Sequence, residues 1–328
     1  MIDRRQMMGM AAATALAPSL VASPVRGQGA ASWPARPIRL IVPYAPGGPT
    51  DAVARLIGDQ LSKSWNQQVV IENKGGAGTN IGADLVAKAD PDGYTMLIGS
   101  GALAINRNLY RTLSYDAVAD FAPVVHICGF SFFMLVPVSS PARTVQEFIA
   151  LAKERKGKMS YASPGTGSPP HLGGELLKHL TGIEMTHVPY RGGGPAYTDL
   201  IAGRVDMMFA SGVAIEQVNA GKLRALAFSS TVRSTALPEV PTVAEAGVPG
   251  FEVSSWYGFF VPAKTPPAIV ANINAATLKT LAEPNVRARL DQLGYAIGGS
   301  TPGELAALLN AEIDKWAPII KAAVIEPQ

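Results

Sequence analysis

Six short loops rich in glycine and hydroxyl residues are the segments of this sequence best suited to chemistry. Each loop follows a short apolar run and precedes a helical pattern of apolar residues. The clearest case is residues 38–55, IRLIVPYAPGGPTDAVAR, in which Gly47 and Gly48 separate the two patterns. The N-terminus of a helix carries unpaired backbone N–H groups at the positive end of the helix dipole. This layout therefore predicts an anion-binding site.

The donor groups of these loops indicate a carboxylate as the anion. Backbone N–H groups, hydroxyls, side-chain amides and phenols all suit a carboxylate. The first loop lacks the Lys-Ser/Thr ending of a nucleotide P-loop, and residues 76–78 lack the full glycine spacing of a dinucleotide site. The predicted ligand-binding residues are Tyr44, Ala45, Gly47, Gly48, Asn80, Ser100, Asn106, Ser163, Gly165, Thr166, Gly167, Ser168, His171, Tyr190, Arg191, Gly192, Gly193 and Asp206.

Metal and cofactor sites are not predicted. His126, His179 and His187 have no acidic or cysteine partners at the spacing of a metal site. Cys128 is the only cysteine, so no internal disulfide can form. Its apolar surroundings favour a buried structural thiol. We therefore expect neither a metal nor a cofactor.

Four residues have two interpretations each, and for Asp206 these are a ligand contact and a structural ion pair. The guanidinium of Arg191 either forks a ligand carboxylate or forms a salt bridge with Asp199 or Asp206. Asp51 suits the first turn of a helix, so we expect it to support the helix terminus rather than to contact a ligand. His171 either donates a hydrogen bond to the ligand or only begins a helix.

An enzymatic function is the alternative to binding. Ser163 or Ser168 could act with His171 as a secreted hydrolase or isomerase, but no complete Ser–His–Asp arrangement follows from their positions. Because many donors occur without an acid–base pair or a metal set, we expect a binding protein and not an enzyme. A third possibility, the effector domain of a regulator, would need a DNA-binding helix pair, for which the leader leaves no room.

Strands alternate with helices along the chain, which predicts an α/β fold with mainly parallel sheets covered on both faces. Thr144 is the expected N-cap of a helix, with Glu147 as its capping-box partner. The predicted strands are residues 69–72, 96–99, 159–163, 186–189, 205–209 and 255–262, and the predicted helices are 81–89, 144–155, 171–180, 196–202, 268–281 and 301–321.

Two sets of these units predict two domains that face each other across a cleft. The apolar run 132–138 is the expected link, and residues 255–262 are the expected return strand. We assign residues 33–135 and 260–328 to a discontinuous first domain and residues 136–259 to the second. Two crossing strands would form the hinge. The loops lie at the carboxyl ends of the strands, where α/β sheets bind ligands.

The composition is that of a folded, exported protein. Apolar residues make up 48% of the 328 residues and charged residues 16%, and the formal net charge is only +3. That charge is too small and too dispersed for nucleic-acid binding. After residue 27 we find no run of about 18 apolar residues, so we expect the mature chain to be soluble.

Residues 1–27 read as an export signal that directs the protein to the periplasm. Arg4 and Arg5 precede an apolar stretch at 7–17, which is too short to span a bilayer, and then a small-residue region. Cleavage after Ala22 and after Gly27 both fit, and the secretory and twin-arginine routes both stay open. The alternative is a disordered cytosolic tail.

Four motifs occur in order along the chain: VPYAPGGPTDAVAR, NKGGAGTNIGAD, YASPGTGSPPHL and VPYRGGGPAYTDLIAGRVDMMF. From Trp33 to the C-terminus the sequence resembles the extracytoplasmic solute receptors of tripartite tricarboxylate transporters, the TctC-like or Bug proteins. The resemblance implies a two-lobed periplasmic-binding-protein fold of type II character with a two-strand hinge. It also implies closure on a carboxylated solute.

The resemblance assigns roles to particular loops. By motif match, Tyr44 to Gly48 would bind a carboxylate largely through backbone groups, often through water, and Ser163–Ser168 and Tyr190–Gly193 would contribute from the other lobe. Ser100 and Asn106 match a further loop, although the segment SGALAIN departs from the commoner form. Thr79 stands where glycine is usual.

The function implied is capture of a small carboxylate for a membrane permease of the tripartite tricarboxylate type, or for a sensor. A dicarboxylate, a tricarboxylate, an acidic amino acid and an aromatic acid all fit the sequence as ligands. We expect a monomer that does not bind nucleic acid.

Overall fold

The computed structural model describes residues 33–322, of which residues 34–322 belong to one compact unit. The predicted export signal at 1–27 lies outside the described residues. No helix within 33–322 is long and apolar enough to cross a membrane.

Sheet A has six strands in the order β11-β4-β10-β3-β1-β2. Strand β1 runs parallel to β2 and β3, whereas β10 runs antiparallel to β3 and β4, and β11 antiparallel to β4. The bounds are β1 Ile38–Val42, β2 Val69–Asn73, β3 Thr95–Ser100, β4 Phe121–Ser131, β10 Ser254–Pro262 and β11 Ala296–Ile297.

Sheet B has five strands in the order β7-β6-β8-β5-β9. Strand β6 is parallel to β7 and β8, and β5 is antiparallel to β8 and β9. The bounds are β5 Phe133–Pro137, β6 Ser160–Ser163, β7 Thr186–Pro189, β8 Met207–Ala210 and β9 Leu223–Phe228.

The α/β class is confirmed, but both sheets are mixed rather than dominated by parallel pairs. The chain leaves β4 at the edge of sheet A where the βα loops lie, and it enters β5 at the corresponding edge of sheet B. A strand that begins at this edge must run antiparallel to the strands that end there. Strand β10 also begins at this edge of sheet A, and it therefore runs antiparallel to β3.

The chain passes between the sheets twice. Phe132 alone separates β4 from β5, and residues 229–253 connect β9 to β10. The two crossings are hydrogen-bonded, because Phe132 N donates to Ser229 Oγ and Ser229 N donates to Phe132 O, each at 2.8 Å. The predicted domain boundaries at 135/136 and 259/260 fall within β5 and β10, each of which belongs to one sheet. The chain changes sheet at Phe132 and within residues 229–253, and the division into domains stays a prediction.

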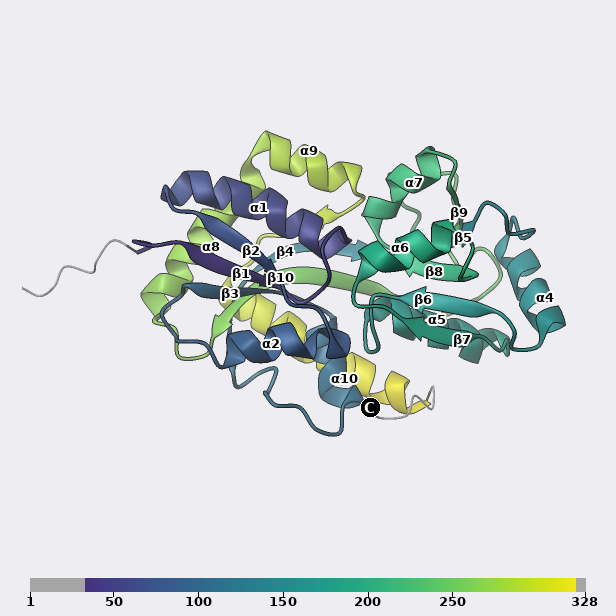
Figure 1. Ribbon diagram of the computed structural model, residues 1–328, viewed down its shortest axis with the longest axis horizontal. Helices are drawn as coiled ribbons and strands as arrows, with labels where there is room; N and C mark the ends of the chain where they lie inside the picture. Colours follow the sequence, from purple (N-terminus) through teal and green to yellow (C-terminus); the bar gives the residue numbers. More distant parts are fainter. Residues whose placement is uncertain (1–32, 323–328) are drawn as a thin grey trace, which may run out of the picture. The chain divides into compact units, whose positions relative to one another are not determined.

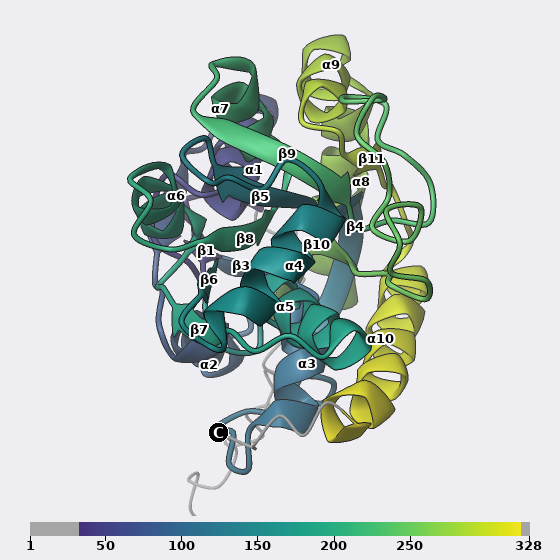
Figure 2. The same ribbon diagram turned by 90° about the vertical axis from the view of Figure 1, so that its right-hand side faces the viewer.

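Helices cover both faces of each sheet (Figure 1). Around sheet A, α1 packs on α8, α2 packs on β3, and α10 packs on α3 and β4. Figure 1 shows α6 and α7 on one side of sheet B and α4 and α5 on the other, and Figure 2 shows the same layers turned by 90°. The bounds are α1 Pro49–Trp65, α2 Asn80–Ala87, α3 Ala102–Leu109, α4 Val145–Arg155, α5 Pro169–Thr181, α6 Gly193–Ile201, α7 Ile215–Asn219, α8 Pro267–Ala282, α9 Pro284–Gln292 and α10 Pro302–Ala322.

The predicted helix start at Thr144 is confirmed. Thr144 Oγ1 accepts a hydrogen bond from Glu147 N at 3.1 Å, so the cap forms as expected. The carboxylate of Glu147 reaches back to Arg143 N, one residue before the expected partner. Helices α7 and α9 and strands β4, β9 and β11 were not predicted from the sequence.

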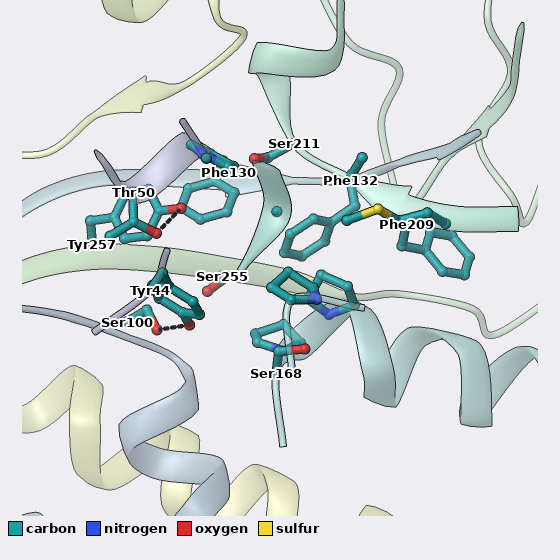
Figure 3. A pocket seen from close by; sticks show the side chains of 18 of the residues that line it. Tyr44, Thr50, Ser100, Phe130, Phe132, Ser168, Phe209, Ser211, Ser255 and Tyr257 are labelled. Carbon is teal, nitrogen blue, oxygen red and sulfur yellow. Dashed lines mark hydrogen bonds between the residues drawn. The ribbon is translucent and has the colours of Figure 1, made fainter. Parts of the chain in front are cut away.

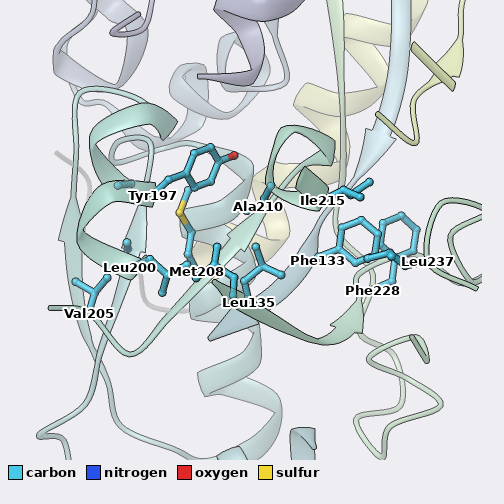
Figure 4. Close-up of a cluster of buried hydrophobic side chains, with 14 of the residues drawn as sticks. Phe133, Leu135, Tyr197, Leu200, Val205, Met208, Ala210, Ile215, Phe228 and Leu237 are labelled. Carbon is cyan, nitrogen blue, oxygen red and sulfur yellow. The ribbon is translucent and has the colours of Figure 1, made fainter. Parts of the chain in front are cut away.

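Each sheet packs its own hydrophobic core. In sheet B, Phe133 and Leu135 of β5 and Met208 of β8 pack against Tyr197 and Leu200 of α6 (Figure 4). Burying each large apolar side chain contributes about 1.5–3 kcal/mol.

In sheet A, Trp256 and Phe260 of β10 pack against Leu305 and Leu309 of α10. The C-terminal helix therefore returns to the sheet that contains the N-terminal strand, as the sequence predicted.

Candidate functional site

A small cavity of about 30 Å³ lies where loops of the two sheets meet. This volume holds one or two water molecules. Figure 3 shows the side chains that surround it. The residues that line it are Tyr44, Gly48, Pro49, Thr50, Ser100, Phe130, Phe132, Pro164, Ser168, Pro169, Pro170, Gly193, Tyr197, Met208, Phe209, Ala210, Ser211, Ser255 and Tyr257.

Hydroxyl groups form the side of the cavity next to sheet A (Figure 3). The hydroxyls of Tyr44 and Ser100 lie 3.0 Å apart, and Thr50 Oγ1 donates to the hydroxyl of Tyr257 at 3.0 Å. Ser255 Oγ is buried and has no hydrogen-bond partner. Each pair leaves a hydroxyl proton for a further acceptor, so this side can donate to an anion.

Apolar groups form the opposite side. Phe132, Phe209 and Met208 face the cavity together with the rings of Pro169 and Pro170 (Figure 3 labels the two phenylalanines). None of the lining residues has a charged side chain. An anion in this cavity would therefore be held by neutral donors and helix dipoles.

The first loop, residues 43–51, is held by a charged residue. Asp51 is buried, and its carboxylate accepts hydrogen bonds from Gly47 N at 3.1 Å, from Nε and Nη2 of Arg55 and from Asn73 Nδ2. Burial raises the pKa of Asp51, but the hydrogen bonds from Arg55, Gly47 and Asn73 outweigh it, and the net pKa is lowered. Asp51 thus supports the loop and the helix terminus, as predicted.

The second loop, residues 163–171, is held by two uncharged histidines. Ser163 Oγ lies 2.7 Å from His187 Nε2, and Gly167 N donates to His171 Nδ1 at 3.2 Å. The two imidazole rings stack with centroids 4.0 Å apart. Burial lowers the pKa of His171 to about 4 and that of His187 to about 3, so both rings are neutral near pH 7.

These contacts do not form the serine–histidine arrangement of the enzymatic alternative. Ser163 is fully buried and meets His187, not His171. Ser168 Oγ donates to Gly165 O at 2.6 Å. The imidazole of His171 therefore shapes the second loop instead of pointing at either serine.

Glycines allow the loops of the two sheets to touch through their backbones. Ala45 N donates to Arg191 O at 2.7 Å. A Cβ on Gly48 would lie 3.3 Å from Gly193 N, and a Cβ on Gly78 would lie 2.2 Å from Thr166 O. Several glycines predicted to contact a ligand thus serve this close approach between the sheets.

Arg191 does not form the predicted salt bridge with Asp199 or Asp206, and its contact with a ligand stays a prediction. Its side chain is exposed, and within residues 33–322 it forms no ion pair. Asp199 pairs with Arg204 and accepts from the hydroxyl of Tyr190 instead. Arg191 lines a separate groove beside the second loop, outside the central cavity.

Asp206 lies at the amino-terminal end of β8, in the middle of sheet B. It directly precedes β8, accepts from Ser160 N at 2.8 Å and pairs with Arg155 at 3.5 Å. Because ligand-binding loops follow the carboxyl ends of strands, its position before the strand places it away from the cavity.

Asn80 and Asn106 also bond to the protein rather than line the cavity. Asn106 Nδ2 donates to Gly78 O at 2.7 Å and to Asn80 Oδ1 at 2.8 Å. Tyr115 donates to the same oxygen of Asn80. The two amides therefore fix the turn at Gly78, which contacts the second loop.

Of the predicted residues, Tyr44, Gly48, Ser100, Ser168 and Gly193 line the cavity. The others that do not line it are Ala45, Gly47, Asn80, Asn106, Ser163, Gly165, Thr166, Gly167, His171, Tyr190, Arg191, Gly192 and Asp206. The sequence missed Met208, Tyr197 and Ser255 altogether. Ser211 could have been found, since it follows the carboxyl end of β8.

Across the described part of the chain, no group of three histidine, cysteine or acidic side chains could hold a metal ion.

The family model of the tripartite tricarboxylate transporter family receptor, TctC, matches residues 53–325. This chain belongs to the TctC family. A UPF0065 protein encoded in the tcbD-tcbE intergenic region of Pseudomonas sp. strain P51 is 43% identical over 319 residues, which cover 97% of this chain and 93% of that protein.

Two solved structures share the fold. Rpa4515 of R. palustris with adipate is 38% identical, with a TM-score of 0.87 over 90% of this chain and 100% of that one. The periplasmic binding protein BugD is 33% identical, with a TM-score of 0.87 and the same coverage. The two sheets thus form the two-lobed fold of periplasmic binding proteins, as the resemblance implied.

Proposed function

We propose that this protein is a periplasmic receptor that captures a small carboxylate between its two sheets and delivers it to a permease of the tripartite tricarboxylate type. The observation that carries the proposal is a cavity lined by free hydroxyls and two uncapped helix N-termini, with no charged side chain. Membership of the TctC family and the adipate bound to Rpa4515 support it.

The first helix terminus is that of α1. Its N-cap is Gly48, which provides no side-chain cap, and the N–H groups of Thr50 and Asp51 bond to nothing within residues 33–322. The second terminus is that of α6, whose N-cap Gly192 also provides no side-chain cap. Both dipoles place partial positive charge beside the hydroxyls of Tyr44 and Thr50, which favours a carboxylate.

Ligand entry requires the sheets to separate. A cavity of about 30 Å³ is smaller than a dicarboxylate such as adipate. The hydrogen-bonded crossings at Phe132 and Ser229 provide a short hinge, because a few residues can absorb the dihedral change of closure. The bond from Ala45 to Arg191 would then form as the protein closes.

We assign ligand contacts to Tyr44, Gly48, Ser100 and Gly193 from the sequence-based set, whereas Ser168 lines the cavity with its hydroxyl proton already donated to Gly165 O. Thr50, Ser211 and Tyr257 join them because they line the same cavity. The remaining predicted residues act by shaping the loops. We further propose a monomer, exported by its N-terminal signal, that carries out no catalysis.

Calorimetric titration of the purified mature protein with a panel of carboxylic acids tests the proposal. The matching methyl esters serve as controls that lack the charge. We expect saturable heat for at least one acid and none for its ester, together with a rise in Tm on ligand binding. Absence of heat and of a Tm rise across the panel would refute a carboxylate receptor.

A matched pair of threonine variants tests the site. Thr50→Val removes, at nearly constant volume, the donor that leaves the phenol proton of Tyr257 free for the ligand. It should weaken binding by about tenfold, since hydrogen bonds to charged groups contribute about 1.5–3 kcal/mol. Thr198→Val changes an exposed threonine on α6 and should leave the affinity unchanged.

A further inference from the structure

We propose that the preferred ligand carries a single carboxylate on an apolar body, as an aliphatic or aromatic monocarboxylic acid does. This inference rests on the proposed function and narrows it. It follows from an asymmetry of the cavity, in which most of the free donors gather on one side and the other side offers mainly apolar surface.

The donors gather where α1 and α6 begin. A Cβ on Gly48 would lie 3.3 Å from Gly193 N and 3.4 Å from Gly194 N, so the two helix termini meet at this glycine. The hydroxyls of Tyr44 and Tyr257 lie on the same side. Ser255, which is 5% exposed, contributes an Oγ without a partner. One carboxylate can use these donors together.

The terminus of α5 also faces the cavity, but it has no donor to offer. Its first two residues are Pro169 and Pro170, which lack N–H groups. The next N–H, of His171, donates to Ser168 Oγ at 3.4 Å, and that of Leu172 donates to Ser168 O. The hydroxyl proton of Ser168 is used by Gly165 O. This helix start therefore presents two proline rings in place of an anion site.

The wall beside α5 continues this apolar surface. Phe132, Met208 and Phe209 line it, and the carboxylate of a dicarboxylic acid would have to lose its water against them. Ser211 is nearby, and its Oγ accepts from the hydroxyl of Tyr295 at 3.0 Å, so its own proton is left to donate, but a single hydroxyl does not match the acceptors of a second carboxylate. Burial of a charge without matched partners is strongly unfavourable, whereas a methyl or phenyl group gains from the same surface.

Hexanoate and adipate form a matched test, because they share six carbons and differ only in the second carboxylate. Titration calorimetry of the mature protein with each acid should show hexanoate binding more tightly by about tenfold or more. Equal or tighter binding of adipate would overturn the inference and leave the proposed function intact. If neither these acids nor any acid of the wider panel bound, the proposed function itself would fail.

Two proline variants test the role of α5. Pro170→Ala restores an N–H at the second position of the helix and should narrow the preference for hexanoate over adipate by about threefold or more. Pro267→Ala makes the same change at the exposed start of α8 and should not alter the preference. A preference unchanged in Pro170→Ala that retains the parent Tm would contradict the assigned role of the prolines.

Discussion

The first loop, at residues 43–51, and the second loop, at residues 163–171, have the same strand–loop–helix layout and are held in different ways. The first depends on the ionised carboxylate of Asp51 and leaves the terminus of α1 free. The second depends on the neutral rings of His171 and His187, and Ser168 caps its helix. The shared sequence pattern thus places both loops at the site. It does not determine which loop offers free N–H donors to an anion.

As the pH falls, the second loop should lose stability before the first loop does. Between pH 6.5 and about 4, the unfolded chain binds protons that the buried His171 and His187 do not, although Glu175 raises the pKa of His171 while Lys178 lowers it. The free energy of unfolding should therefore fall as the pH falls, by about 1.4 kcal/mol per pH unit for each histidine. The stability that the Asp51 carboxylate contributes is lost only as the pH falls below 3.8, the ordinary pKa of an aspartate, because its pKa in the folded protein is lower still.

Urea unfolding at several pH values between about 7 and about 4 measures this slope. His187→Gln should reduce the slope by about half, because one of the two buried bases is gone. His179→Gln changes an exposed histidine of α5 and should preserve the slope. A slope that is the same in the parent and in His187→Gln would contradict the neutral-histidine account.

The contact between the second loop and sheet A can be broken at Gly78. Its φ is +60°, and a Cβ would lie 2.2 Å from Thr166 O and 2.6 Å from the hydroxyl of Tyr110. Gly78→Ala should prevent full closure and lower ligand affinity by more than about tenfold, since backbone atoms cannot yield as a flexible side chain does.

Gly47→Ala is the matched control in the first loop. Its φ is +79°, but no atom lies within 4 Å of the added Cβ. We expect a stability cost of about 1–2 kcal/mol from the positive φ alone, with a smaller effect on affinity than Gly78→Ala. Comparable losses of affinity in the two variants would show that strain, and not the contact between sheets, is responsible.

The ionic support of the first loop should be measurable through Asp51. Asp51→Ala removes the acceptor of Gly47 N, Arg55 and Asn73 and should lower the free energy of unfolding by about 2–3 kcal/mol. The control is Asp59→Ala on the same helix, whose ion pair with Lys63 is exposed and contributes less than about 1 kcal/mol. Urea unfolding compares them, and equal effects would contradict the role of Asp51.

Arg191 should give the smallest effect on binding. Because its side chain lies outside the central cavity and is exposed, Arg191→Ala should change the affinity for any carboxylate by less than about twofold. Calorimetric titration decides this. A loss of tenfold or more would restore the interpretation in which its guanidinium forks the ligand carboxylate.

Local signals allowed much of the fold to be predicted. Glycine, proline and serine mark the ends of strands and the starts of helices, so β7 at Thr186–Pro189 and the cap at Thr144 were predicted residue for residue. The direction of β5, the strand that enters sheet B, was harder to predict, because it depends on where the chain crosses between sheets.

The site was predicted less fully than the loops that surround it. Tyr44, Ser100 and Ser168 were found because each belongs to a loop after a strand. Met208 and Ser255 were missed, since they reach the cavity only when two sheets pack together, and no local pattern encodes that packing. Several glycines of the predicted loops lie close to the backbone of the opposite sheet's loops, an approach that no local pattern predicts.

The bond from Ala45 N to Arg191 O and the approach of Gly48 to Gly193 use main-chain atoms only. These two contacts therefore use neither of the apolar side chains Met208 and Phe209, which line the cavity. Substitutions at Met208 or Phe209 should change which ligand is recognised and leave these backbone contacts in place. This separation makes the scaffold a practical starting point for building sensors of new small molecules.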